Sequence, residues 1–434
     1  MRWCSLLSLV FRMTASGAEP QHPFPQHLTY APGTIRPTNY TQAQQDTDVR
    51  NAYASWKASF VVAVNAAPPQ QRMPQSKASD HEATSPRRIK PAPAQYRIAF
   101  GKAGAKKSQT VSEGQGYGMV ILAMMAGADA QAQIIFDGLW RFVRANPSSG
   151  DARLMAWQIP TAKGDSPDSA FDGDADIAYA LLLADKQWGS TDTIHYKEEA
   201  VKMITGIKAA TIGPASKLPL LGDWVKNSSH TEWETRSSDF MYGHFRAFGR
   251  ATSDAVWPQV VTATQSTATS LQAEFSAATG LLPDFIVAKT LNPFTPKPAP
   301  PKFLEDATDG DYYYNACRDP WRIGTDALIN NDATSVAQAR KMSAWIATAT
   351  GGDPNKLRAG YKLSGTPVNG SDYFTTAFVA PFGVAAMTVG TQQAWLNKIY
   401  ASMRTAREDY FEDSINLQCL LIMTGNFWDP TLMP

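Results

Sequence analysis

The feature that most constrains this chain is a long succession of segments in which apolar residues recur every three or four positions. That spacing places apolar side chains on one face of an α-helix, and glycine or proline tends to end the segments, as is typical of helices. No comparable run of alternating apolar and polar residues predicts a sheet. The helical segments are residues 116–146, 174–189, 195–211, 239–253, 260–279, 321–331, 336–350, 377–389, 391–406 and 410–425.

So many amphipathic helices without strands predict an all-α fold built from helical hairpins. The segments share no tight sequence repeat, so a solenoid of fixed period is not indicated. A closed helical barrel needs no such period and remains possible.

Charge and composition exclude several partners. The chain has 434 residues with 40 Lys and Arg against 39 Asp and Glu, a formal net charge of +1, and its globular part has no dense basic run. Nucleic acid is therefore not an expected partner. No apolar run reaches the ~18 residues that a membrane span needs, so we expect a soluble protein.

The three cysteines, Cys4, Cys317 and Cys419, have neither the spacing of a zinc site nor the even number of a disulfide framework. A single bridge between Cys317 and Cys419 stays open.

Three segments differ from the helical pattern. Residues 1–20 combine one early Arg, a short apolar stretch and small residues, which predicts a secretory leader. Residues 66–94 are rich in Pro, Gln and Ser and predict a disordered insertion or surface loop. A second proline cluster, residues 291–306, lies among well-patterned segments, so we expect a long ordered loop there, which is often functional.

The first candidate site is "SEGQGYGM", residues 112–119, where Glu113 precedes a strongly apolar helix. The glycines would allow a tight turn and the close approach of a ligand to the backbone. Glu113 alone could simply stabilise the helix N-terminus.

The second candidate site is "FDGDADIAYALLLA", in which Asp172, Asp174 and Asp176 precede another apolar helix. A calcium loop would need a terminal glutamate that is missing. One Asp could cap the helix while the others stay solvated. A carboxylate that faced a cleft would instead hold a sugar ring and stabilise positive charge at its anomeric carbon.

The third candidate site, residues 303–326, joins acids, tyrosines, an asparagine, two arginines and a tryptophan. Stacking aromatics beside carboxylates and guanidinium groups suit a polyhydroxylated or aminated substrate. An ion-paired surface loop is the alternative interpretation.

Together the three motifs resemble glycoside hydrolase family 8. The resemblance extends through "LMAWQI", "SSDFMYGHFRAF", "NACRDPWRIGTD" and "LLIMTGNFWDP" and spans nearly the whole chain except residues 1–20 and 66–94. It implies one domain, residues 21–434, folded as an (α/α)6 barrel that cleaves β-1,4-linked glucan, xylan or chitosan with inversion. It implies no cofactor and no metal.

By this resemblance Glu113 is the general acid, and Asp174 lies beside the scissile bond. Phe171 stands where the family has Ser or Thr, so the choice between Asp172 and Asp174 stays open. The base of the best-known subfamily is an Asp, but Asn315 occupies that position, and an amide cannot accept the proton.

A second subfamily, which includes chitosanases and β-1,3-1,4-glucanases, has Asn there and uses a Glu of the preceding loop. The matching residue is Glu305, with Asp306 or Asp309 as alternatives. Glu113 would protonate the glycosidic oxygen while Glu305 removes a proton from the attacking water. Inversion requires the two carboxyl groups to lie roughly 6.5–9.5 Å apart.

The expected substrate contacts come from polar residues at family positions and from aromatic platforms, because the chain is rich in Trp and Tyr. The candidates are Asp172, Trp157, Tyr117, Asp239, Tyr313, Asn315, Arg318 and Trp321, with Trp224 and Trp428 as further platforms.

The many acids of the motif loops favour chitosan, whose ammonium groups they would attract. We therefore predict a secreted, monomeric endo-acting chitosanase with a polysaccharide as its partner. The alternatives are an endo-β-1,4-glucanase or β-1,3-1,4-glucanase and, more remotely, a non-catalytic toroid that only binds polysaccharide.

Overall fold

The computed structural model describes residues 17–64, 93–191, 193–225, 228 and 230–433. Most of the expected leader at 1–20 and of the expected insertion at 66–94 lies outside these residues.

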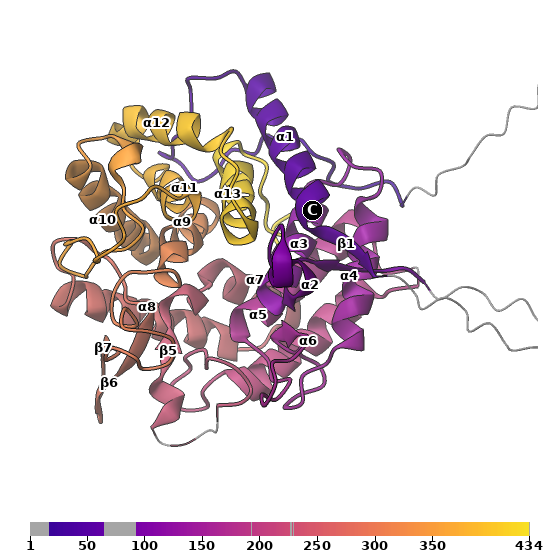
Figure 1. Cartoon of the computed structure of the whole chain (residues 1–434), viewed down its shortest axis with the longest axis horizontal. Coiled ribbons are helices and arrows are strands. Elements are labelled where there is room, and N and C mark those ends of the chain that lie inside the picture. The colour runs from indigo at the N-terminus through magenta and orange to yellow at the C-terminus, as the bar shows by residue number, and fades with distance from the viewer. Residues whose placement is uncertain (1–16, 65–92, 192, 226–227, 229, 434) are drawn as a thin grey trace, which may run out of the picture.

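Within the described residues, six helices form an inner ring in which each contacts the next and the last contacts the first. Six longer or more exposed helices surround them, each packed on an inner partner (Figure 1). The inner helices are α3 (Ser112–Met124), α5 (Phe171–Trp188), α7 (Tyr242–Thr252), α9 (Asp319–Asn330), α11 (Thr376–Ala386) and α13 (Tyr410–Met423); the outer helices are α1 (Gln42–Phe60), α4 (Ala132–Ala145), α6 (Tyr196–Thr211), α8 (Val256–Glu274), α10 (Ala333–Ala349) and α12 (Gln393–Met403).

This arrangement is an (α/α)6 barrel, so the predicted fold class is confirmed. The sequence explains which helices lie inside. All 11 residues of α11 are buried, whereas only 7 of the 16 residues of α6 are. A helix that is apolar all round must be covered on every side, while an amphipathic helix can face water.

The inner helices run in one direction, because α1 precedes the first of them and an outer helix returns along the barrel wall between each inner helix and the next. Their N-termini therefore meet at one end of the barrel. Glu113, Asp172, Arg318 and Tyr410 lie at or beside the starts of four different inner helices. This end thus carries Glu113, Asp172 and Arg318, which the motifs singled out, together with Tyr410.

The strands that the sequence did not predict lie at the edges of the barrel. Strand β1 (Val61–Val64) pairs with β2 (Gln95–Ile98), and β3 (Thr110–Val111) with β4 (Gln158–Ile159). A third sheet has the order β5 (Thr235–Arg236), β6 (Phe285–Leu291), β7 (Phe294–Pro298). The β6–β7 hairpin takes the first half of the proline cluster, so the expected loop is shorter than predicted and follows β7.

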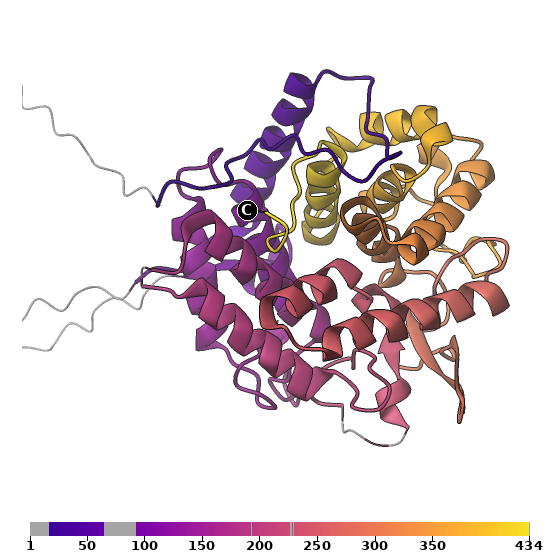
Figure 2. The same ribbon diagram turned by 180° about the vertical axis from the view of Figure 1, so that it is seen from behind.

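The opposite end of the barrel is covered by the N-terminal segment, which runs beside the C-terminus (Figure 2). The backbone N–H of Leu28 donates to the carbonyl of Gly425, and the hydroxyl of Tyr30 donates to that of Phe427. Substrate access is therefore favoured at the end where the inner helices begin.

Cys317 and Cys419 are buried and unbridged, so the disulfide that the sequence left open does not form. Among the described residues, no helix has the length and apolar character to cross a bilayer. No group of three or more His, Cys, Asp or Glu side chains in this part of the chain is placed to hold a metal ion.

Candidate active site

A cleft of about 550 Å³ opens where the inner helices begin. Its walls come from the first turns of α3, α5 and α13, the turn before α9 and the loops between them. The lining residues are Phe100, Lys106, Val111, Ser112, Glu113, Trp157, Ala170, Asp172, Arg236, Glu305, Tyr314, Asn315, Arg318, Asp409, Tyr410, Phe411 and Glu412.

Glu113 lies in the first turn of α3, and its side chain turns into the cleft instead of capping the helix. Its Oε2 accepts a hydrogen bond from Nη1 of Arg318 at 2.6 Å, and its Oε1 accepts one from the hydroxyl of Tyr410 at 2.8 Å. Burial raises the pKa of Glu113, and nearby Asp172 raises it further, although Arg318 and Tyr410 act in the opposite direction. A raised pKa is what a proton donor needs.

The glycines that follow Glu113 serve packing and do not form a turn. They are helical, and each leaves room for a neighbour. A Cβ on Gly114 would lie 2.8 Å from the hydroxyl oxygen of Tyr410, and one on Gly116 would lie 2.6 Å from the Cβ of Asp176. The predicted tight turn is therefore wrong, and the missing side chains instead let α5 and Tyr410 approach α3.

Asp172, and not Asp174, is the acid of α5 that faces Glu113. Nη1 of Arg318 donates to its Oδ2 at 2.7 Å, and Nη2 of Arg236 lies 3.0 Å from its Oδ1. Burial alone would raise the pKa of Asp172, but Arg236 and Arg318 outweigh it and hold the pKa well below its ordinary value. Asp172 is thus a permanent negative charge beside Glu113.

Glu305 is exposed on the far side of Arg318 and reaches the cleft from the loop after β7. Its Oε2 accepts a hydrogen bond from Nδ2 of Asn315 at 2.9 Å, while Oδ1 of Asn315 accepts one from Nη2 of Arg318 at 3.0 Å. Glu113 and Glu305 are thus linked through a guanidinium and an amide, and these groups lie between the two carboxyls.

The loop that carries Glu305 is held by Asp309. The carboxylate of Asp309 accepts the backbone N–H groups of Leu304, Glu305 and Asp306 at 2.7–3.0 Å. Oδ1 of Asp306 accepts a hydrogen bond from the backbone N–H of Thr308. Neither of the alternative bases lines the cleft.

Exposed aromatic rings stand at the cleft. Trp157 is 39% exposed and lines it. Tyr314 also lines it, and its hydroxyl lies 2.8 Å from that of Tyr373, which is 41% exposed. Such rings can stack against the apolar faces of sugars.

Several predicted contacts lie below the cleft surface. Asp174 is fully buried, where its Oδ1 accepts the N–H of Met155, and burial raises its pKa well above the ordinary value. The predicted position of Asp174 in the cleft is therefore wrong. Asp239 is also fully buried and accepts hydrogen bonds from Arg236, so it holds that arginine instead of reaching a sugar.

The aromatic predictions need similar corrections. Tyr117 and Trp321 are buried in the core, with ring centroids 5.9 Å apart, and Trp428 is buried as well. None of them presents a ring to solvent. Tyr313 is partly buried against Tyr314 and does not line the cleft.

Sequence reasoning missed Arg236, Tyr314, Tyr410 and Phe411, all of which line the cleft. Tyr314 lay one position from the predicted Tyr313. Tyr410 and Phe411 open an apolar helix, as Glu113 does, and that shared position was a usable signal. Arg236 offered none, because only the β5–β6 pairing brings it to the site.

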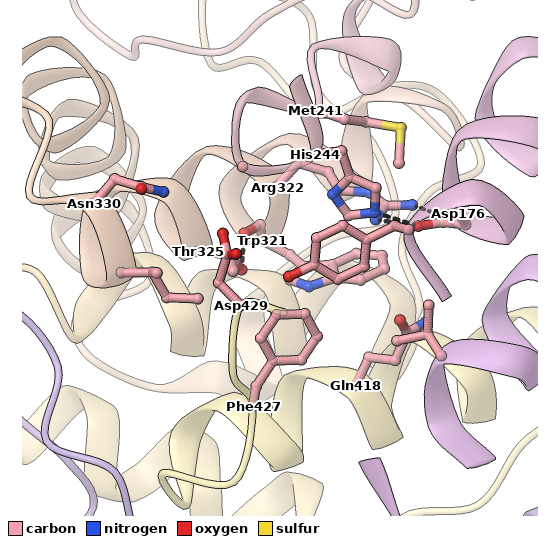
Figure 3. A pocket seen from close by; sticks show the side chains of 14 residues that line it. Asp176, Met241, His244, Trp321, Arg322, Thr325, Asn330, Gln418, Phe427 and Asp429 are labelled. Carbon is pink, nitrogen blue, oxygen red and sulfur yellow. Dashed lines mark hydrogen bonds and ion pairs between the residues drawn. The ribbon is translucent and has the colours of Figure 1, made fainter. Parts of the chain in front are cut away.

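A second charged cluster lies deeper between the inner helices (Figure 3). Arg322 donates to both carboxylate oxygens of Asp176, at 3.0 and 2.5 Å, and Nε2 of His244 lies 2.8 Å from Oδ1 of Asp176. The cavity beside them holds about 20 Å³, which is room for about one water molecule. It is too small for a sugar.

The fold and the site define a carbohydrate-cleaving enzyme: a helical barrel has an open cleft with two separated carboxyls and exposed aromatic rings. The sequence profile of glycosyl hydrolases family 8 matches residues 97–425. The chain therefore belongs to glycoside hydrolase family 8, and the predicted enzyme class, an endo-glycosidase of this family, is confirmed.

Several similar proteins support this assignment. A β-glucanase of Niallia circulans is 39% identical over 98% of this chain and 96% of its own. An endoglucanase of Bacillus sp. strain KSM-330 is 38% identical over 95% and 83%. The apo structure of a β-1,3-1,4-glucanase from Paenibacillus sp. X4 has a TM-score of 0.83 at 39% identity and covers 94% of this chain and 100% of that one. Rex8A from Paenibacillus barcinonensis shares the fold, with a TM-score of 0.67 at 15% identity over 91% and 97%.

Proposed function

We propose that this protein is an inverting endo-β-glucanase that cleaves β-1,4-glucan or mixed-linked β-1,3-1,4-glucan. The observation that carries the proposal is the pair Glu113 and Glu305, which line one cleft and are separated by Arg318 and Asn315. The relatives at 38–39% identity are named as glucanases, which favours glucan over the chitosan that the sequence suggested.

The proposed reaction follows from the charges around each carboxyl. Glu113, whose pKa is raised, donates a proton to the glycosidic oxygen. Asp172 stays ionised and stabilises the positive charge that develops at the anomeric carbon. Glu305 takes a proton from a water molecule that attacks the opposite face of the sugar.

Several acids of the motif loops, which favoured chitosan in the sequence, have other partners in the structure. Asp151 is paired with Arg153, Asp309 holds backbone N–H groups, and Asp176 is buried with Arg322. None of these three acids lines the cleft. The cleft lining itself has five acids, Glu113, Asp172, Glu305, Asp409 and Glu412, against the three cations Arg236, Arg318 and Lys106. Its charge therefore does not disfavour an ammonium-rich polymer, and the choice of glucan rests on the named relatives.

Location and assembly belong to the same proposal. A polymeric glucan is too large to enter a cell, so we propose that the enzyme is secreted and acts as a monomer with an open cleft. An endo mode of action would be seen as a loss of polymer viscosity that precedes most of the release of reducing ends.

The test is the release of reducing ends from mixed-linked β-glucan, carboxymethylcellulose, chitosan and xylan. We expect the wild type to be most active on a glucan, and Glu113→Gln and Glu305→Gln to lower kcat about 10³-fold. Asp306→Asn is the matched control, because Asp306 is adjacent to Glu305 but bonds to Thr308. Highest activity on chitosan, or normal turnover by Glu305→Gln, would overturn the proposal.

A further inference from the structure

A buried carboxyl group outside the cleft lining, that of Asp284, holds the turn that carries Asn315. Asp284 immediately precedes β6 and is 3% exposed. Its Oδ1 accepts the backbone N–H groups of Tyr313 at 3.0 Å and Ala316 at 2.7 Å. Its Oδ2 lies 3.5 Å from Nδ2 of Asn315. Because burying a carboxyl group costs free energy, we expect a carboxyl group at this position to have a function.

Asp284 also lies where three parts of the site meet. Its backbone N–H donates to the carbonyl of Asp311 at 2.8 Å, in the loop that carries Glu305, and its carbonyl accepts the N–H of Ser237 at 3.2 Å. The next residue, Phe285, pairs with Arg236 across strands β5 and β6. Movement of Asp284 would therefore disturb the Glu305 loop, the Asn315 turn and Arg236 together.

The amide of Asn315 has one favourable orientation. Its Oδ1 accepts from Nη2 of Arg318 at 3.0 Å and lies 3.4 Å from Nη1 of Arg236, so its Nδ2 faces Glu305 and Asp284. The flipped amide would set its NH₂ against two guanidinium groups and its oxygen against two carboxyl groups. Donors therefore face acceptors on both sides of the amide.

We propose that Asp284 and Asn315 are positioning residues for the general base. Asp284 fixes the 313–316 turn, and Asn315 then holds Oε2 of the exposed Glu305 with a hydrogen bond, so that its carboxylate stays aimed at the attacking water. The inference rests on the proposed function, because it takes Glu305 as the base. Neither positioning residue exchanges a proton with substrate or water.

Asn315→Ala tests the second link. Without the donor, we expect kcat to fall ~10- to 100-fold with little change in KM. The acidic limb of the kcat/KM profile should move to higher pH, because a carboxylate that loses a hydrogen-bond donor holds its proton more tightly. An unchanged profile with unchanged kcat would overturn the proposal, since a merely structural role does not move the limb.

Asp284→Asn tests the first link. Asparagine keeps an oxygen for the two backbone N–H groups but turns its own NH₂ toward that of Asn315. We expect kcat to fall ~10-fold and the variant combined with Asn315→Ala to be no slower than Asn315→Ala alone, because Asp284 acts through Asn315. Effects that multiply would overturn the proposal. Asp311→Asn is the matched control, since only the backbone carbonyl of Asp311 holds Asp284.

The two proposals fail in different ways. If Glu305→Gln turns over normally, the base assignment and the positioning inference fall together. If Glu305→Gln is inactive while Asn315→Ala and Asp284→Asn both match the wild type in kcat and pH profile, only the positioning inference falls. Thermal unfolding of each variant separates either result from loss of fold.

Discussion

Two charged clusters lie one helical turn apart in this barrel, and the ion pairs of both join helix α5 to the start of α9. In the cleft, Arg318 of the turn before α9 binds Asp172 of α5; one turn deeper, Arg322 of α9 binds Asp176 of α5. Four residues separate the members on each helix, so the deeper pair lies directly below the upper one.

The two clusters differ in what else is present. The deeper carboxylate has its charge fully matched, because Arg322 and His244 outweigh burial and hold the pKa of Asp176 below its ordinary value. In the cleft, Arg318 is shared by two acids, Glu113 and Asp172. Burial and the neighbouring Asp172 together raise the pKa of Glu113 by more than the shared Arg318 lowers it. Burial beside the ionised Asp172 thus sets Glu113 apart from Asp176, whose charge is matched by Arg322 and His244.

The largest expected effect comes from Asp172→Asn and Asp176→Asn, which neutralise equivalent acids in the two clusters. We expect Asp172→Asn to lower kcat ~10²- to 10³-fold and to change the melting temperature little. Asp176→Asn should cost about 3–5 kcal/mol of stability, because it leaves Arg322 uncompensated in the core, and change kcat of the folded enzyme only a few-fold. Kinetic measurements and thermal unfolding of both variants check these expectations. A large loss of stability in Asp172→Asn, with a large loss of kcat in Asp176→Asn, would contradict the distinction between the two clusters.

An intermediate effect is expected from Tyr410→Phe. The hydroxyl of Tyr410 stabilises the ionised form of Glu113, so its removal should raise the pKa of Glu113 further. Glu113 must be protonated to act, and activity is lost as the pH rises through its pKa. The basic limb of the kcat/KM profile should therefore move to higher pH. A shift to lower pH would contradict the role given to this hydroxyl.

The smallest expected effects come from two glycines of α3. Gly114→Ala would place a Cβ against the hydroxyl of Tyr410, and Gly118→Ala would place one against Ile98. We expect Gly114→Ala to shift the basic limb in the same direction as Tyr410→Phe, but by less than that substitution does. Gly118→Ala is the control and should change stability alone. Equal pH profiles for the two variants would show that Gly114 does not govern the acid.

The sequence predicted the helices and the place of Glu113 at the start of one of them, but not the depth of each side chain. Helix α5 begins at Phe171, three residues before the predicted segment, and side chains two positions apart lie on nearly opposite faces of a helix. This is why Asp172 faces the cleft while Asp174 faces Met155. The predicted motif therefore reaches the cleft through Asp172 and not through Asp174.

Residues brought by distant contacts were harder to predict. The turn 313–316 receives its shape from Asp284, about 30 positions earlier, and no local pattern gives that pairing. The same turn decides that Tyr314, and not Tyr313, lines the cleft. Glu305 was found only through a resemblance, because an exposed loop has no periodicity to interpret.

In the proposed reaction, Glu113 and Glu305 act on opposite faces of one sugar. Proton NMR of the first products from a mixed-linked β-glucan tests it most directly, because the spectrum resolves the anomer before mutarotation. We expect the α-anomer to appear first, by inversion of the β-linkage. Initial formation of the β-anomer would contradict it, since retention needs a nucleophile in contact with the anomeric carbon instead of a base that activates water.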